Sequence, residues 1–203
     1  LHSCTHSFPT RRSSDLYAQI IDDTVGNTLV SASTLQKEVK ANLEHTNDVA
    51  AAAYLGKVIA EKALEIGAKL IVTEKDMGLD NQVIVEDSKK AYALMCANFF
   101  DNPSKKMKMI GITGTNGKTS STLLLKHVLE VVKGAKVGLM GTMENIIGDE
   151  HIPADRTTPE SFELQALLAR MRAAGCTHVI MEVSSHAIAL DRVAGITYDV
   201  ASF

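Results

Sequence analysis

The sequence predicts an α/β protein in which a mostly parallel sheet carries helices on both faces and follows a small α+β segment. Two observations support this prediction. From residue 68 onward, short apolar runs that suit buried strands alternate with helical patterns, and the connections between them are short. A glycine-rich turn lies directly between one such run and a helix. In parallel sheets of this kind, ligands bind outside the carboxyl ends of the strands.

Residues 1–16 show neither helical nor strand periodicity, so we expect a disordered lead-in. The stretch from His6 to Leu16, HSFPTRRSSDL, resembles one reading frame of a common short-read sequencing adapter, which would make it an assembly scar. His2, Cys4 and His6 alternate as metal ligands can, but alternation in a segment without periodicity is weak evidence for a site.

Residues 17–67 predict a β-hairpin and a helix. The alternating runs YAQIID and TLVSAS are separated by turn-forming Asp, Gly and Asn residues. Asn47 or Asp48 can cap the following helix, and Gly67 suits its C-terminal end. The spacing predicts one buried helix face made of Ala52, Leu55, Ile59, Ala63 and Ile66.

Residues 68–104 predict two further strands, in KLIVTEK and QVIVED, and then a helix from Ser88 to Asn98. A linker with Asn102 and Pro103 follows this helix. The helix face expected to be buried consists of Ala91, Leu94, Met95 and Ala97.

The strongest functional signal is the turn after the apolar run Met109–Thr113. The helix predicted over Ser121–Glu130 follows it, with Leu124, Leu125, Val128 and Leu129 on its buried face. Glycines let successive N–H groups point at one anion beneath a helix N-terminus. In such a P-loop, Lys118 adds charge at the β/γ-phosphates and the Thr119 hydroxyl holds Mg²⁺. The predicted phosphate cradle consists of Gly114, Thr115, Asn116, Gly117, Lys118, Thr119 and Ser120.

The match to the general P-loop pattern has one defect. The pattern places its first glycine five residues before the glycine of Gly-Lys, but Ile112 stands there and Gly111 comes one residue too early. An ordinary strand-to-helix turn is the alternative interpretation.

The next predicted strand covers Lys136–Leu139, and Gly138, Gly141 and Gly148 predict a flexible excursion toward Pro153. A helix is expected from about residue 159 to Ala174, with Thr158 as its N-cap and Pro159 at its first position.

The last predicted strand is His178–Val183, with Glu182 at its carboxyl end. A carboxylate there can meet a magnesium ion held by Thr119, since hard cations prefer oxygen ligands. A surface glutamate at a strand end is the plainer alternative, and the apolar neighbours of Glu182 argue against it. His186 suits a base or a hydrogen-bonded loop residue equally.

Composition limits the classes of protein. The net charge of −3 argues against a nucleic-acid surface covering the whole molecule. The three cysteines (Cys4, Cys96 and Cys176) have no pairing or zinc spacing, as expected of reduced thiols. No run suits a membrane span or a secretion signal, so we expect a cytoplasmic protein. We also expect a monomer.

Three ordered motifs, GITGTNGKTSS, DRTTPESFELQ and MEVSSHAIALDRV, resemble the Mur ligases over residues 68–203, most closely the type that adds a diamino acid to UDP-N-acetylmuramoyl-L-alanyl-D-glutamate. The Gly-x-x-Gly-Thr-Asn-Gly-Lys-Thr form of that family includes Gly111. The resemblance implies that ATP phosphorylates the D-Glu carboxylate and that the diamino acid attacks the acyl phosphate. It implies ATP binding by 114–120, catalysis by Lys118, Mg²⁺ binding by Thr119 and Glu182, and substrate contacts by Thr157, Thr158, Ser184 and Arg192.

The chain departs from this pattern in two respects. Leu190 stands where some relatives carry a polar substrate contact, so no role is transferred to it. The sequence stops at Phe203, before the family's Asp-His motif, carbamylated lysine and C-terminal domain, so we expect a fragment without ligase activity. The residues that would choose between diaminopimelate and lysine are among those missing.

A second resemblance covers residues 17–67, which are similar to the eighteenth protein of the bacterial large ribosomal subunit and imply 5S rRNA as a partner. This segment has few basic residues relative to its acidic ones, so we expect weak or no RNA binding. A chimeric, inactive reading frame is the third possibility. The predicted segments are a lead-in at 1–16, the ribosomal-like part at 17–67, the end of a ligase N-terminal domain at 68–104 and a truncated central domain at 105–203.

Overall fold

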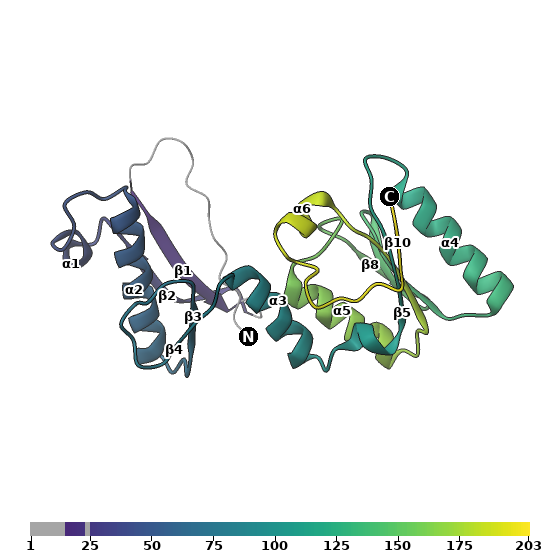
Figure 1. Ribbon diagram of the computed structural model, residues 1–203, viewed down its shortest axis with the longest axis horizontal. Coiled ribbons are helices and arrows are strands. Elements are labelled where there is room, and N and C mark those ends of the chain that lie inside the picture. Colours follow the sequence, from purple (N-terminus) through teal and green to yellow (C-terminus); the bar gives the residue numbers. More distant parts are fainter. Residues whose placement is uncertain (1–14, 23–24) are drawn as a thin grey trace. The chain divides into compact units, whose positions relative to one another are not determined.

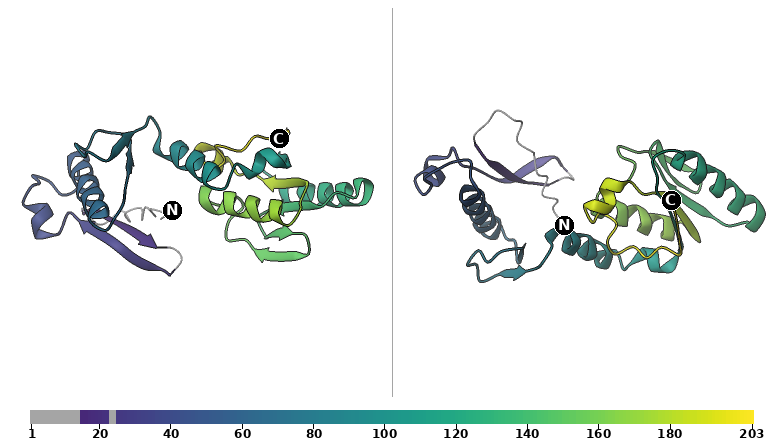
Figure 2. Two further views of the ribbon diagram at one scale, coloured as in Figure 1. Left: turned by 90° about the horizontal axis from the view of Figure 1, so that it is seen from below. Right: turned by 45° about the horizontal axis from the view of Figure 1, so that its top comes forward.

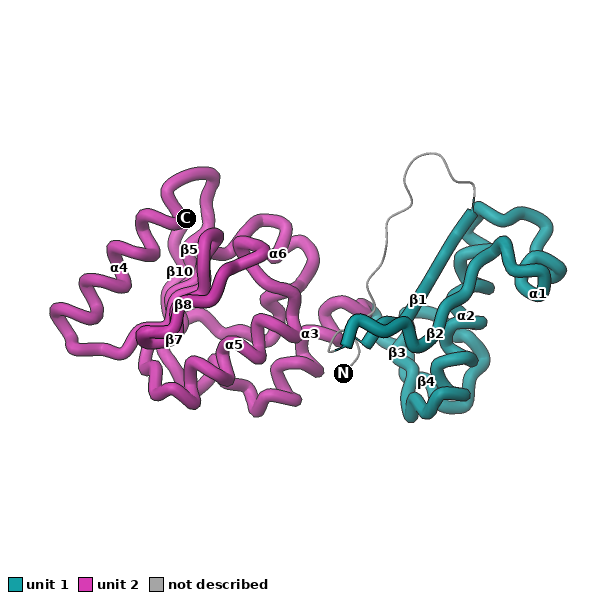
Figure 3. Tube along the Cα trace, turned by 180° about the vertical axis from the view of Figure 1, so that it is seen from behind, with its two compact units in different colours: residues 1–86 teal, residues 87–203 magenta. Residues whose placement is uncertain are grey.

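A computed structural model describes residues 15–22 and 25–203, which divide into two compact units between Glu86 and Asp87 (Figure 3). Most of the predicted lead-in, the adapter-like stretch to residue 14 and the His2–Cys4–His6 pattern therefore lie outside the described residues. The boundary between the units falls inside the 68–104 segment. Among the residues that the structure describes, no helix combines the length and apolar character that crossing a bilayer requires.

Unit 1 contains the predicted hairpin, with β1 (Tyr17–Asp22) antiparallel to β2 (Asn27–Ser33). A short helix α1 (Lys37–Lys40) and the long helix α2 (Val49–Glu65) follow. The small core of this unit joins the hairpin to both helices through Ala32, Val39 and Leu55.

The capping residues of α2 are confirmed, but part of its predicted buried face is wrong. Asp48 accepts a 2.7 Å hydrogen bond from the Ala51 N–H, and Gly67 has a φ of 104°. Ala52 and Ile66 are exposed, since the face against the hairpin is turned toward Ala51 and Ala60 and the helix ends before Ile66. Leu55 and Ala63 are buried as predicted.

The two predicted strands of the next segment are β3 (Ile71–Thr73) and β4 (Gln82–Ile84). They pair in parallel, with Ile71 opposite Gln82. The loop between them is held by Asp76, whose side chain accepts from the Gly78 N–H at 2.8 Å and from Gln82. These bonds hold the pKa of Asp76 below its ordinary value.

Unit 2 is an α/β domain built on a six-stranded sheet (Figure 1). The strand order is β10-β5-β9-β6-β7-β8, and the first four strands are parallel, which confirms the predicted mostly parallel sheet. Its elements are α3 (Ser88–Phe99), η1 (Pro103–Lys106), β5 (Lys108–Ile112), α4 (Lys118–Lys133), β6 (Val137–Met140), β7 (Glu144–Ile147), β8 (Glu150–Pro153), α5 (Ser161–Ala173), β9 (His178–Glu182), α6 (Ser185–Ala189) and β10 (Val200–Ser202).

Helices cover both faces of this sheet, as predicted. Alternate residues of β9 point to opposite faces. Val179 and Met181 belong to the larger core with α5, whereas Ile180 belongs to the smaller core against which Leu125 and Leu129 of α4 pack. On the α5 side, α3 lies alongside α5 (Figure 2), and the rings of Phe100 and Phe162 stand 5.2 Å apart.

The predicted buried faces of α3 and α4 are partly wrong. Leu124 is 65% exposed and Val128 is also exposed, because the sheet contacts α4 along a narrow line through Leu125 and Leu129. In α3, Leu94 and Met95 are exposed. Ala97 is buried as predicted, and Ala93 and Cys96 complete the buried face in place of the two larger side chains. Spacing predicts an apolar stripe but not which edge of the stripe a sheet will cover.

The flexible excursion predicted after β6 is also wrong. The segment forms the antiparallel hairpin β7–β8, which extends the sheet, and Gly148 occupies its turn with a φ of 62°. Gly138 lies within β6, where an added Cβ would stand 2.6 Å from the Met171 sulfur. Glycine is needed there for close packing of the helix on the strand and does not mark a loop.

Gly111, the glycine that breaks the general P-loop pattern, also has a packing role. It lies within β5, and a Cβ at this position would stand 2.7 Å from Cε1 of Tyr198. Burial raises the pKa of Tyr198, whose hydroxyl donates to the Met181 sulfur at 3.3 Å. The next residue, Asp199, accepts from the Met109 N–H at 2.9 Å and pairs with Lys108. Gly111 therefore makes room for the segment that leads into β10.

We predict that Gly111→Ala lowers the free energy of unfolding by about 1–3 kcal/mol, because the added methyl group overlaps the Tyr198 ring in a packed core. Chemical denaturation of the single variants and of the double variant with Tyr198→Ala measures the coupling. Gly111→Ala should cost clearly less once the ring is absent. Strictly additive losses would show that the ring is not what excludes a side chain at residue 111.

Candidate functional site

The glycine-rich loop lies between a strand and a helix, as predicted. Strand β5 ends at Ile112 and α4 begins at Lys118. Gly114 and Gly117 have φ values of 129° and 80°, in the region that favours glycine. The loop therefore curls at the N-terminus of a helix of 16 residues, where unpaired N–H groups and the helix dipole favour an anion.

The ammonium group of Lys118 folds back over this loop. Its Nζ donates to the Gly114 carbonyl at 2.8 Å and to the Thr115 carbonyl at 3.4 Å. Within the described part of the chain, Lys118 makes no ion pair with a carboxylate. Its positive charge is therefore held at the loop by neutral carbonyls and is available to an incoming anion.

Glu182 lies at the carboxyl end of β9 with no exposed surface. One carboxylate oxygen accepts from the Thr142 N–H at 3.0 Å, and the other accepts from the Thr142 hydroxyl at 3.1 Å. No ion pair joins Glu182 to any residue that the structure describes. Since an ionised carboxylate is costly to bury without a counter-charge, this position favours a cation.

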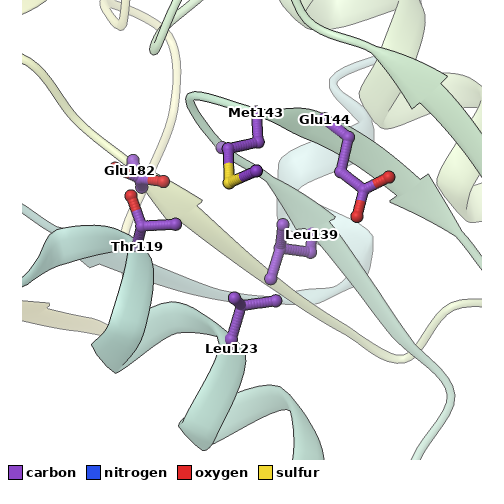
Figure 4. Close-up of a pocket in the computed structure, with 7 residues that line it drawn as sticks. Thr119, Leu123, Leu139, Met143, Glu144 and Glu182 are labelled. Carbon is purple, nitrogen blue, oxygen red and sulfur yellow. The ribbon is translucent and has the colours of Figure 1, made fainter.

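Thr119 and Glu182 line one small pocket (Figure 4). The strand end of β9 supplies Glu182 and the first turn of α4 supplies Thr119. The other lining residues are Leu123, Leu139, Gly141, Met143 and Glu144.

The oxygen donors of this pocket fit a magnesium ion. Mg²⁺ commonly takes one or two carboxylates and completes its shell with water and substrate phosphates. No group of three or more His, Cys, Asp or Glu residues suited to a metal occurs among the described residues. A metal here would therefore use the Thr119 hydroxyl and the Glu182 carboxylate together with phosphate oxygens at the neighbouring loop.

Three of the four predicted substrate residues cluster around Glu182. The Thr157 hydroxyl lies 3.1 Å from the Thr142 hydroxyl. Thr158 is buried, and its hydroxyl donates to the Glu182 carbonyl and accepts from the Ser184 N–H, both at 3.0 Å. Ser184 in turn caps α6 by accepting from the Ala187 N–H.

This arrangement corrects the predicted start of α5. Thr158 is not its N-cap, because its hydroxyl bonds instead to the Glu182 carbonyl at the end of β9 and to the Ser184 N–H in the turn after that strand. Helix α5 begins at Ser161, and Glu160 stands at the N-cap position without a side-chain cap. The helix ends at Ala173, one residue before the predicted end, and Gly175 follows it with a φ of 82°.

Arg192 follows α6 in the sequence and lies beside the N-terminal end of α5. Its guanidinium group pairs with Glu160 at 2.8 Å, and Glu160 also pairs with Arg156. The Arg192 side chain is only 18% exposed, and its carbonyl accepts from the Ser161 hydroxyl at 3.1 Å. His186, whose role the sequence left open, is exposed within α6.

Two residues beside Glu182 were not predicted as part of the site: Gly141 was interpreted as part of a flexible excursion, and Thr142 was given no role. Both directly follow β6, at the same edge of the sheet as Glu182 and the glycine-rich loop. The rule that ligands bind at the carboxyl ends of parallel strands would have selected them, but they belong to none of the three motifs.

We predict that Thr158→Val lowers the free energy of unfolding by about 1–3 kcal/mol, because it removes the hydroxyl that bonds the buried Glu182 carbonyl and the partly buried Ser184 N–H. Thr157→Val is the matched control, since Thr157 is partly exposed and, among the described residues, its hydroxyl has a hydrogen bond only with that of Thr142. Denaturant titration of both variants gives the comparison. Equal small losses would mean that Thr158 does not hold the β9 end in place.

Comparisons with known proteins match two parts of the chain. Residues 112–203 match the family model of the Mur ligase middle domain, and residues 8–79 match that of ribosomal L18 of archaea, bacteria, mitochondria and chloroplasts. The chain is 52% identical over 151 residues to UDP-N-acetylmuramoyl-L-alanyl-D-glutamate--2,6-diaminopimelate ligase 1 of Clostridium acetobutylicum and 50% identical over 154 residues to the corresponding ligase of Clostridium botulinum.

These alignments cover 73% of this chain but only 31% and 32% of the two ligases. They are longer than the stretch after residue 79, so the ligase and ribosomal matches overlap. A solved structure of a UDP-N-acetylmuramoyl-L-alanyl-D-glutamate--2,6-diaminopimelate ligase superposes with a TM-score of 0.62 at 26% identity, covering 71% of this chain and 30% of that one. Residues 112–203 are therefore similar in sequence to the Mur ligase middle domain, and the fold is similar to that of the solved ligase.

Proposed function

We propose that unit 2 binds ATP and Mg²⁺ as the nucleotide site of a ligase that joins a diamino acid to UDP-N-acetylmuramoyl-L-alanyl-D-glutamate through an acyl phosphate. The observation that supports this proposal is the pocket shared by Thr119 and the buried Glu182 beside the glycine-rich loop. The names of the relatives, which specify 2,6-diaminopimelate, support a diamino acid as the joining substrate.

Each residue of the site has a distinct task under this proposal. The N–H groups of 114–120 bind the phosphates, and the Lys118 ammonium leaves the Gly114 carbonyl to stabilise the transferring phosphoryl group. Thr119 and Glu182 hold Mg²⁺, which neutralises phosphate charge when it is bound. Positioning and charge compensation supply most of the catalysis in phosphoryl transfer.

The substrate residues differ in how directly they can act. Thr157 and Ser184 are partly exposed and can contact the muramoyl-dipeptide. Thr158 is buried, so we assign it the indirect task of holding Glu182 and Ser184 in place. Arg192 can contact a substrate carboxylate only if its pairing with Glu160 is exchanged or shared.

The chain spans about 31% of the length of these ligases, so the proposal for this chain alone is nucleotide binding without ligation. We predict that ATP with Mg²⁺ binds with a measurable heat and that Lys118→Ala weakens binding about 10- to 100-fold, since hydrogen bonds to charged groups contribute about 1.5–3 kcal/mol. Lys133→Ala, at the far end of the same helix, is the control. Identical titrations for wild type and Lys118→Ala would refute the site.

A second candidate function is 5S rRNA binding, favoured by the ribosomal L18 match at 8–79. The excess of acidic side chains in the segment argues against RNA binding. Phosphate neutralisation supplies most RNA affinity, and the lysines of residues 17–67 are outnumbered by the acidic side chains of Asp22, Asp23, Glu38, Glu44, Asp48, Glu61 and Glu65. We therefore predict no salt-sensitive gel shift with 5S rRNA. A specific shift that weakens steeply with salt would establish the RNA-binding function instead.

A further inference from the structure

Thr142 contacts the Glu182 carboxylate through its backbone N–H and its hydroxyl, although it lies outside the three family-like motifs. Its N–H donates to one carboxylate oxygen at 3.0 Å and its hydroxyl lies 3.1 Å from the other. No other hydrogen bond to this carboxylate is found among the described residues. One residue therefore fixes both oxygens of a side chain that is completely buried.

The main chain at Gly141 also approaches the Glu182 carboxylate closely. A Cβ at Gly141 would stand 2.8 Å from the Glu182 Oε1 atom, so the carboxylate lies directly against the main chain at residue 141. Because Gly141 and Thr142 are consecutive, a single short turn after β6 sets both the space and the orientation of the Glu182 side chain.

The hydroxyl protons can be placed by counting donors and acceptors. An ionised carboxylate only accepts hydrogen bonds, so the single hydroxyl proton of Thr142 points to Glu182. The Thr157 hydroxyl, 3.1 Å from that of Thr142, must then donate to it. Removing the Thr157 hydroxyl thus leaves both bonds from Thr142 to Glu182 in place, whereas removing the Thr142 hydroxyl frees one carboxylate oxygen.

We propose that Thr142 is a positioning residue of the metal site: it holds the Glu182 carboxylate in the orientation in which it meets a divalent cation beside Thr119. This inference rests on the proposed function, because it concerns the same magnesium site. Residues that orient a metal-binding carboxylate commonly change metal affinity about 10- to 100-fold when they are mutated.

The test is the affinity of the full chain for Mn²⁺, a paramagnetic substitute for Mg²⁺, measured by electron paramagnetic resonance in the presence of a non-hydrolysable ATP analogue. We expect Thr142→Val to weaken Mn²⁺ binding about 10- to 100-fold. Thr142→Ser, which keeps the hydroxyl, should restore binding close to that of wild type. Thr177→Val, which removes an exposed threonine hydroxyl just before β9, at the end of the strand opposite Glu182, should also bind as wild type does.

Two further variants make the outcome decisive. Thr142→Ala removes the same hydroxyl with less bulk and should show the same loss of Mn²⁺ affinity. It replaces Thr142→Val in the test if that variant folds poorly. Glu182→Gln tests the metal site itself. Wild-type affinity in Thr142→Val and Thr142→Ala, together with lost binding in Glu182→Gln, would overturn the role of Thr142 and leave the metal site standing. Wild-type affinity in Glu182→Gln would instead overturn the metal assignment of the proposed function.

Discussion

The burial of the Glu182 carboxylate at the end of β9 is the constraint on which the site depends. A fully buried carboxylate needs hydrogen bonds or a counter-charge, and the surrounding turns supply the hydrogen bonds. Thr142 donates twice to the carboxylate, Thr158 donates to the carbonyl of the same residue, and the absence of a side chain at Gly141 leaves room for it. No described residue places a positive charge beside this carboxylate, which explains why the position suits a cation.

The order of the strands brings the parts of this site together. Strand β9 lies between β5 and β6, with Glu182 opposite Ile112 and Met181 opposite Met140. The turns after these three parallel strands therefore meet at one edge of the sheet. One turn carries the glycine-rich loop, the next carries Glu182, and the third carries Thr142, so residues far apart in the sequence become neighbours without any long connection.

Much of the site could be predicted because its signals are local. A strand, a glycine-rich turn and a helix follow each other directly around Lys118, and Glu182 ends an apolar run. The features that were missed depend on partners distant in sequence. Gly111 is needed because Tyr198 packs on it, and Thr158 bridges to Ser184 instead of capping α5. The β7–β8 hairpin was interpreted as a loop because glycine is typical both of flexible segments and of tight hairpin turns.

We propose that the turn after β5 and the buried carboxylate after β9 together bind a nucleotide phosphate with its metal ion. A crystal structure of the chain with Mg²⁺ and a non-hydrolysable ATP analogue would test this proposal. We expect phosphate at the N-terminus of α4, Lys118 moved from the Gly114 carbonyl onto a phosphate oxygen, and Mg²⁺ held by Thr119 and Glu182. Nucleotide bound elsewhere, with Lys118 still on Gly114, would contradict it.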